Sequence, residues 1–270
     1  MSDPAVPLGR MSEPPICLAG GRRLALDDLP WNVEAVVPEQ FGDGLGIPDY
    51  LASHYWWAYV HPNAVRLFER DWLVNLILWG NYAKLRDAAL AELGEELPGA
   101  TLQVACVYGD LTVRLSERVA LAGGTIDVID VLPVQLNNLR RKLPQRAPAR
   151  LLRQDSTDLN LPDASYDRAL LFFLLHEQPQ HYRARTLSEA YRVVKPGGKI
   201  VIMDYALPHW WNPLRVLWRP LLARLEPFAL DLWRQDIADW LPDEAAPERL
   251  RQERLFGGLY QKVVITRSGA

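Results

Sequence analysis

The 270-residue sequence lacks several features that mark particular classes of protein. It has only two cysteines, Cys17 and Cys106, and they lie far apart. They suggest neither a disulfide framework nor a metal-binding knuckle, so a reducing cytosol is the expected location. The formal net charge is −3, and there is no basic tail and no known nucleic-acid motif. We therefore expect no nucleic-acid partner.

Long hydrophobic runs are also missing. No stretch approaches the roughly 18 uninterrupted apolar residues that a membrane-spanning helix needs. The first residues contain four prolines, and the apolar run around Ile16–Ala19 is too short for the core of an export signal. We expect a protein that is not integral to a membrane, with residues 1–30 as a disordered tail.

Tryptophan, by contrast, is abundant and unevenly placed. None of the ten tryptophans lies between residues 101 and 203. Five lie in the first third of the chain and five near its end (Trp31, Trp56, Trp57, Trp72, Trp79, Trp210, Trp211, Trp218, Trp233 and Trp240). The distribution predicts a conventional central domain between two aromatic flanks.

The first aromatic flank predicts an N-terminal helical region over residues 31–98. Within it, residues 49–93 have a helical pattern that Pro62 interrupts, and Val65, Phe68, Trp72 and Leu76 recur at helical spacing. Its flat side chains suit a lid over a flat ring, although core packing explains any single one equally well. The lid residues in question are Tyr55, Trp56, Trp57, Tyr59, Trp72, Trp79 and Tyr82.

Residues 99–270 alternate between apolar strands and helices. Strands are predicted at 101–108, 125–130, 149–155, 167–175 and 199–205, with helices at 110–122, 133–143 and 181–194 between them. Such alternation indicates a parallel α/β sheet of the Rossmann type, covered by helices on both faces. A helical insert over 207–245 precedes two closing strands, 251–256 and 258–267. The sequence allows one of these two strands to be antiparallel to the others.

Polar residues follow four of the predicted strands, where an open parallel sheet binds its ligands. Gly109–Thr112 follows the first strand, and Asp130 ends the second, 21 residues after Gly109. A carboxylate at that distance is suited to a ribose. Asp155–Ser156 ends the third strand and is placed to bind an adenine amine, and His176–Glu177 ends the fourth. Any single acid of this kind is more often a helix cap, as Asp110 could be, but the whole set predicts a nucleoside site.

These motifs resemble those of the ubiquinone and menaquinone methyltransferases, which are class I methyltransferases that use S-adenosylmethionine. The resemblance covers about residues 100–205 and is carried by VACVYGDLT, DVIDV, RQDSTDLNLPDASYD and EAYRVVKPGGKIVIMDY. The first motif departs from the family pattern at Gln103, Val107 and Tyr108. Valine stiffens the loop, and tyrosine adds bulk where the methionine part of the cofactor is expected. The adenosine half of the site is thus kept, and the methionine half is changed.

A narrower resemblance covers about residues 50–266. VYGDLT, the aromatic block that begins YWWAYVHPNAVRLFERDW and the closing FGGLYQKVVIT are similar to the rhodoquinone biosynthesis proteins of the RquA family. The resemblance implies that ubiquinone exchanges a ring methoxy group for an amino group, with S-adenosylmethionine as the nitrogen donor and manganese (Mn2+) assisting. A metal would polarise the quinone carbonyl.

The resemblance also implies roles for individual residues. Tyr108, His176 and Glu177 are the expected catalytic residues, and His176, Glu177 and Asp204 the expected metal ligands, since oxygen and imidazole suit manganese. Alternatively, His176 and Glu177 only line the pocket and Asp204 begins a loop. The expected cofactor-binding residues are Val107, Tyr108, Gly109, Asp110, Thr112, Asp130, Val131, Asp155 and Ser156.

The C-terminal insert predicts two amphipathic helices. Leu214, Leu217, Leu221 and Leu225 form one apolar stripe, and the second stripe comprises Leu230, Trp233, Ile237 and Trp240. These helices either only cover the sheet edge and the pocket or also rest on a bilayer, which would place a cytoplasmic protein peripherally on the inner face of the membrane.

Two other functions stay open at this point: a conventional quinone or phenol methyltransferase with a divergent loop, and a catalytically silent cofactor-binding protein. The oligomeric state is not predicted.

Overall fold

The computed structural model describes residues 16–17, 23–24, 47–55, 68–245 and 249–269. The chain divides into two units, residues 1–32 and residues 33–270. In the first unit, strands β1 (Ile16–Cys17) and β2 (Arg23–Leu24) pair in antiparallel fashion. The rest of the predicted tail, 1–30, lies outside the described residues, as do residues 56–67 of the predicted lid.

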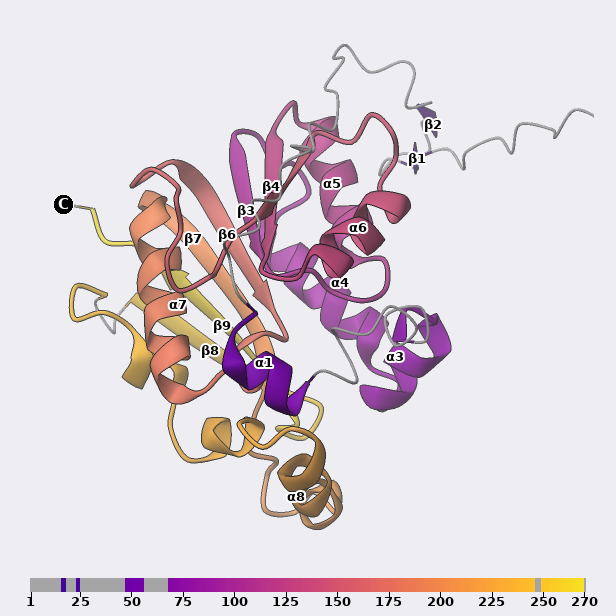
Figure 1. Ribbon diagram of the computed structural model, residues 1–270, viewed down its shortest axis with the longest axis vertical. Helices are drawn as coiled ribbons and strands as arrows, with labels where there is room; N and C mark the ends of the chain where they lie inside the picture. Colours follow the sequence, from indigo (N-terminus) through magenta and orange to yellow (C-terminus); the bar gives the residue numbers. More distant parts are fainter. Residues whose placement is uncertain (1–15, 18–22, 25–46, 56–67, 246–248, 270) are drawn as a thin grey trace, which may run out of the picture. The chain divides into compact units, whose positions relative to one another are not determined.

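A seven-stranded sheet forms the centre of the second unit, in the order β5-β4-β3-β6-β7-β9-β8 (Figure 1). The strands are β3 (Ala100–Val104), β4 (Thr125–Asp130), β5 (Ala149–Arg153), β6 (Tyr166–Phe172), β7 (Val194–Tyr205), β8 (Leu250–Leu255) and β9 (Tyr260–Thr266). The first five pair in parallel, and β9 is antiparallel to both β7 and β8. The predicted sheet is confirmed, and the closing pair is antiparallel.

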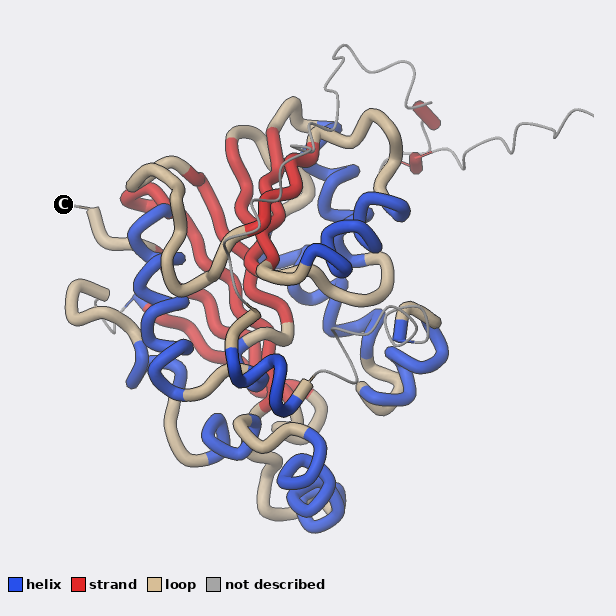
Figure 2. The backbone as a smooth tube through the Cα atoms, viewed as in Figure 1, coloured by secondary structure: helices blue, strands red, loops and turns tan. Residues whose placement is uncertain are grey.

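The central strands are apolar along their whole length because both faces of the sheet are covered. Leu170 and Leu171 are adjacent in β6, so their side chains lie on opposite faces, yet neither is exposed. Helix α7 (Gln180–Val193) lies on one side of the sheet, and α4 (Tyr82–Leu93), α5 (Leu111–Leu121) and α6 (Pro133–Lys142) lie on the other (Figures 1 and 2).

Two short helices, α1 (Asp49–His54) and α3 (Asp71–Ile77), precede the sheet in the chain. The turn after α3 is tied to the far end of the chain, because the Tyr260 hydroxyl donates to the carbonyl of Leu78 at 2.9 Å. No helix among the described residues is long and apolar enough to cross a membrane.

The insert between β7 and β8 differs in part from the expectation. Its first predicted helix is present as α8 (Leu214–Leu225). The second stripe is divided between two 3-10 turns, η4 (Ala229–Trp233) and η5 (Ile237–Trp240), so a second α-helix was a wrong prediction. The reason is Asp236, whose backbone is extended and whose side chain forms a reciprocal capping box with Asp239, so that a new turn begins there.

Candidate functional site

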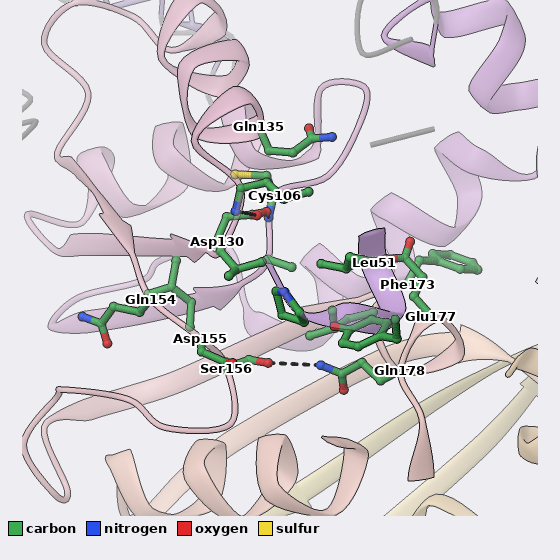
Figure 3. Close-up of a pocket in the computed structure, with 17 residues that line it drawn as sticks. Leu51, Cys106, Asp130, Gln135, Gln154, Asp155, Ser156, Phe173, Glu177 and Gln178 are labelled. Atoms are coloured by element: carbon green, nitrogen blue, oxygen red, sulfur yellow. Dashed lines mark hydrogen bonds between the residues drawn. The ribbon is translucent and has the colours of Figure 1, made fainter. Parts of the chain in front are cut away.

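A cleft lies at the carboxyl ends of β3, β4 and β5, where sequence analysis places a nucleoside (Figure 3). We call it the strand-end cleft. Its lining includes Asp130, Val131, Asp155, Ser156, Glu177 and Gln178. Of the predicted cofactor residues, the structure therefore brings together those that follow β4 and β5. In Figure 3, Cys106 and Asp130 lie at one end of the cleft, and Ser156 and Gln178 at the other.

Asp130 is held rigidly at the end of β4. One carboxylate oxygen accepts the N–H of Cys106 and the other accepts the N–H of Leu132, both at 2.8 Å. Burial raises the pKa of Asp130 to about 6, although these backbone N–H groups act to lower it. The Cys106 thiol and the Val131 N–H also donate to this carboxylate, so a ligand hydroxyl would share its oxygens with these donors.

The other end of the cleft is a network of polar side chains that hold one another in place. Asp155 accepts the backbone N–H and the hydroxyl of Thr157, both at 2.8 Å. The Ser156 hydroxyl lies 2.8 Å from that of Thr186 and accepts from the Gln178 amide at 3.1 Å. Such fixed acceptors suit recognition of a planar amine.

The loop that carries the unusual Val107 and Tyr108 is packed from outside by aromatic and amide side chains. The Tyr108 ring stacks on Phe68, with 5.8 Å between ring centroids. Its hydroxyl accepts from the Gln135 amide at 2.9 Å, and burial raises its pKa. Residues Val107 and Tyr108 both line a second cavity, which is described below.

Gly109, Asp110 and Thr112 line neither cavity, so the structure does not bring these predicted cofactor residues together with the others. Gly109 has φ +82°, and a Cβ there would lie 2.4 Å from the Tyr82 hydroxyl. Its close neighbour is therefore a tyrosine rather than a ligand. Both oxygens of the Asp110 carboxylate accept from one Arg86 nitrogen, Nη1, at 2.7 and 2.8 Å, and one of them also accepts from Arg114 at 2.6 Å.

Asp110 is not a side-chain helix cap either, since it makes no capping hydrogen bond at the start of α5. Tyr82 serves that end of the helix, because its hydroxyl accepts the N–H of Leu111 at 3.0 Å. Thr112 is buried, and its hydroxyl has no hydrogen-bond partner among the described residues.

Glu69 and Lys142, which the sequence analysis did not identify, form hydrogen bonds to the loop Val107–Gly109. One Glu69 carboxylate oxygen accepts from the Gly109 N–H at 3.0 Å and from the Lys142 ammonium at 2.6 Å, and the other accepts from Asn138 at 2.5 Å. Lys142 also donates to the carbonyls of Val107 at 3.3 Å and Gly109 at 2.9 Å. The segment before α3, the loop and α6 are therefore tied together.

A larger cavity of about 580 Å³ adjoins the strand-end cleft and shares Cys106, Gln135, Phe173 and Glu177 with it. We call it the apolar chamber. Most of its walls are apolar side chains, to which α3 and α8 contribute four residues each. The lining residues with polar groups are Tyr82, Tyr108, Gln135, His176, Glu177, Tyr205 and Glu226. This combination of apolar walls and few polar groups is typical of a small-molecule site.

His176 and Asp204 form a buried pair at one wall of the chamber. The His176 Nδ1 lies 3.0 Å from one Asp204 oxygen, which also accepts the N–H of Tyr205 at 2.7 Å. The other oxygen accepts the N–H groups of Leu175 at 2.8 Å and His176 at 3.3 Å. Burial lowers the pKa of His176, but the Asp204 carboxylate outweighs this effect, and the pKa rises to about 9.

The predicted metal set of His176, Glu177 and Asp204 does not fit a metal ion. No group of three or more His, Cys, Asp or Glu side chains in the described part of the chain could hold one. Both Asp204 oxygens are occupied by N–H donors, so this residue orients the imidazole instead. His176 Nε2 lies 3.8 Å from the Glu177 carboxylate, too far for a hydrogen bond between the two groups. Asp204 does not begin a loop, since it lies within β7.

Glu226, at the end of α8, is a further acid that sequence reasoning missed. It lines the chamber, and the buried Tyr55 hydroxyl bonds to its carboxyl group. Burial raises the pKa of Glu226, and His176 partly offsets this. The sequence gives no signal for this role, because a single acidic residue at the end of a predicted helix normally faces solvent.

Arg183 on α7 anchors the insert against the strand ends. Its side chain is fully buried and donates to the carbonyl of Leu175 at 2.6 Å, to the carbonyl of Phe228 and to Asp231 at 3.3 Å. Its guanidinium also lies 4.9 Å from the centre of the Trp240 ring. The insert is therefore a fixed wall of the site.

Comparison with known proteins agrees with this geometry. The family model for a methyltransferase domain matches residues 101–198. A demethylmenaquinone methyltransferase of Thermus thermophilus is 30% identical over 159 residues, which are 58% of this chain and 70% of the relative. Demethylmenaquinone methyltransferases of Geobacillus and Staphylococcus aureus are 27% and 29% identical over 51% and 55% of this chain. The chain spans only 58% and 60% of these two relatives.

Solved structures share the fold at low sequence identity. Human N-acetylserotonin methyltransferase, in complex with S-adenosylmethionine, has a TM-score of 0.55 at 16% identity, over 82% of this chain and 62% of that one. A phosphoethanolamine N-methyltransferase of Haemonchus contortus has a TM-score of 0.54 at 11% identity, over 82% and 60%. Both are methyltransferases, and the likeness is one of fold.

Asp130 lies at one end of the strand-end cleft and the polar groups around Ser156 at the other, as expected of a site for the adenosine half of S-adenosylmethionine. With these residues on the sheet described above, the chain belongs to the class I S-adenosylmethionine-dependent methyltransferase family and is related to demethylmenaquinone methyltransferases.

Proposed function

We propose that this protein converts ubiquinone to rhodoquinone by replacing a ring methoxy group with an amino group, with S-adenosylmethionine as the amino donor. The observation that carries the proposal is the loop Val107–Gly109. Its two unusual side chains line the apolar chamber next to the strand-end cleft, where the methionine half of the cofactor would enter. Valine and tyrosine there leave less room than glycine and threonine, and so favour a turned methionine.

In this proposal Asp130 binds the ribose, and Val131, Asp155 and Ser156 lie around the base. The quinone ring occupies the chamber, against the aromatic faces of Phe173 and Tyr205. Bound S-adenosylmethionine would supply an α-amino nitrogen, whose addition to the ring expels the methoxy group as methanol. The nitrogen–Cα bond of the methionine then has to break; elimination with loss of a proton from Cβ would leave the amino group on the ring and release the cofactor as an unsaturated acid, without an oxidant or reductant.

His176 and Glu177 are placed to assist at opposite ends of the reacting group. The imidazole, oriented and held protonated by Asp204, can donate from Nε2 to a quinone carbonyl and draw electrons from the ring. Glu177 lines both the cleft and the chamber, so its carboxylate is placed to accept a proton from the attacking amine. Tyr108 bounds the ring on the side of the loop. Manganese stays a prediction of the resemblance, and no step depends on it.

The proposed substrate, ubiquinone, is soluble in lipid, so the protein has to reach it at a membrane. We propose a cytoplasmic protein that associates peripherally with the inner face of the membrane through the insert, where Trp210 and Trp211 are exposed beside Arg215 and Arg219.

Conventional methyl transfer to a quinone is the second candidate, and it is favoured by the relationship to demethylmenaquinone methyltransferases. Both reactions share the strand-end cleft. They differ in which end of the methionine faces the chamber, and misplacement by about 1 Å can cost a hundredfold in rate. A catalytically silent protein is the third.

Isotopic labelling separates the three functions. The protein is incubated with ubiquinone and S-adenosylmethionine that carries heavy nitrogen in the amino group and heavy carbon in the S-methyl group, with and without added manganese. We expect heavy nitrogen, and no heavy carbon, in the quinone product analysed by mass spectrometry. Heavy carbon in the quinone would establish methyl transfer instead, and an unmodified quinone in every arm would favour the silent protein.

A matched variant tests the loop itself. Val107→Gly with Tyr108→Thr restores the residues of ordinary methyltransferases, and we expect amine transfer to fall at least tenfold while S-adenosylmethionine still binds. Unchanged amine transfer in this variant would remove the observation on which the proposal depends.

A further inference from the structure

The exposed large apolar side chains in the described part of the chain concentrate on two segments, both of which contribute residues to the lining of the apolar chamber. Apart from Ile47, every exposed large apolar side chain among the described residues lies on α3 and the turn after it or on residues 210–225. We call this set the apolar rim: Trp72, Leu76, Ile77, Trp79, Trp210, Trp211, Val216, Leu217, Leu221 and Leu225.

The two halves of the rim belong to one surface. Leu76, Ile77 and Trp79 from the α3 side line the chamber, as do Leu221 and Leu225 from α8. The rings of Trp79 and Trp218 meet edge to face, with 5.4 Å between their centroids. The chamber therefore opens between two helices whose outward faces are apolar, and Figure 1 shows both helices at the same end of the second unit.

The apolar side chains of the rim are more exposed to solvent than is usual on a surface that stays in contact with water. Trp210 is 85% exposed, Val216 82% and Leu76 65%. Many large apolar side chains exposed on neighbouring segments mark a surface that is covered by a partner or by lipid. The charges favour lipid, because α8 (LRVLWRPLLARL) contains three arginines and no acidic residue. Arginine beside exposed tryptophan suits the headgroup region of an anionic bilayer.

We propose that the apolar rim of α3 and α8 together inserts into the surface of an anionic bilayer, so that the apolar chamber opens directly into the lipid. An apolar ligand then passes from the membrane into the chamber without crossing water, and a long chain attached to its ring stays in the lipid. The identity of the ligand rests on the proposed function, whereas the docking surface does not.

Vesicle binding tests the docking surface without any reaction. The full chain is sedimented with vesicles of phosphatidylcholine alone and of phosphatidylcholine mixed with phosphatidylglycerol. We expect binding to the anionic vesicles, and quenching of tryptophan fluorescence when the lipids carry bromine on their acyl chains. Trp72→Ser on α3 and Leu217→Ser on α8 should each weaken binding roughly tenfold, as expected for losing one inserted apolar side chain.

Ile47 and Ile77 form a matched control, since each is 39% exposed. Ile77→Ser, in the rim, should weaken vesicle binding, and Ile47→Ser should leave it unchanged. Equal effects of these two substitutions, or wild-type binding by Trp72→Ser, would remove α3 from the docking surface and overturn the proposal. The proposal is also overturned if the wild type binds no vesicles but forms a dimer, and substitutions in the apolar rim dissociate that dimer.

Entry of the substrate from the lipid into the apolar chamber is tested with two quinones in the labelling assay. Trp72→Ser and Leu217→Ser should lower amine transfer to a long-chain ubiquinone in vesicles, and leave transfer to a water-soluble ubiquinone without the isoprenoid tail unchanged. Equal loss with both quinones would contradict entry from the lipid. A chain that binds vesicles through both helices but aminates neither quinone would refute the proposed function and leave the docking surface standing.

Discussion

Single carboxylates in this protein have roles that depend on the direction of the side chain as much as on its place in the sequence. Asp130 and Asp110 both follow strands of the sheet and both were predicted to bind the cofactor. Asp130 faces the strand-end cleft, whereas Asp110 turns toward Arg86 and Arg114. Their effects on cofactor binding should therefore differ.

Replacing Asp130 should weaken the binding of S-adenosylmethionine. Asp130→Ala removes charge-assisted hydrogen bonds to the ribose, so we expect a loss of about 1.5–3 kcal/mol in a calorimetric titration of the folded variant. Asp110→Asn is the control. It should destabilise the protein by breaking ion pairs, but change the affinity by no more than about twofold. Unchanged affinity in Asp130→Ala would mean that the ribose lies elsewhere.

His176 should make the stability of the protein depend on pH. Its pKa is about 9 in the folded protein, above the value of about 6.5 that is usual for an unfolded chain. The stabilisation from the charged imidazole is therefore complete below pH 6.5 and is lost as the pH rises through 9.

Urea unfolding of the wild type and of His176→Gln measures this contribution. The difference in unfolding free energy between the two proteins should be largest near pH 6 and should shrink by pH 9.5. A difference that stays constant over this range, or grows, would show that Asp204 does not hold the imidazole charged.

At the scale of elements, the segment before α3, the unusual loop and α6 are joined through Glu69. Its carboxylate accepts from Gly109, Asn138 and Lys142, and the ion pair with Lys142 is mostly buried. Glu69 and Lys142 are thus positioning residues, which act on the site by holding the loop.

Glu69→Gln should weaken the contacts that hold the segment before α3, the loop and α6 together. We expect the unfolding free energy to fall by about 1–3 kcal/mol, because a charged group in a largely buried network is lost. We also expect faster hydrogen exchange at the Gly109 amide. Glu95→Gln is the matched control, since Glu95 pairs with Arg118 at 3.3 Å but its side chain is 79% exposed, and it should cost no more than about 0.5 kcal/mol. Equal losses in the two variants would argue against a specific role for Glu69.

At the scale of the whole molecule, residues 33–270 form one unit that contains the sheet, the cleft and the chamber. A chain that begins at Val33 should therefore fold with the same unfolding free energy as the full chain, to within about 0.5 kcal/mol. Its affinity for S-adenosylmethionine should also be unchanged. A large loss of either, measured by urea unfolding and calorimetry, would show that residues 1–32 contribute to the site.

Over residues 100–205 the sequence by itself determined the order of strands and helices along the chain, because apolar runs such as LLFF are typical of a sheet that is covered on both faces. It also determined that Asp130, Asp155 and His176 lie at one edge of the sheet, since the carboxyl ends of parallel strands meet there. The C-terminal insert was predicted only in part, because the break at Asp236 depends on its capping box with Asp239.

Only the tertiary structure decided which of these side chains face the site. Asp204 turns inward to hold His176, and Gly109 makes room for Tyr82, because buried charges and tight turns are settled by their neighbours. Glu69 and Glu226 reach the loop and the chamber from segments far away in the chain. Sequence spacing places a residue at an edge of the sheet, but the direction of its side chain depends on contacts between residues that the chain brings together only when it folds.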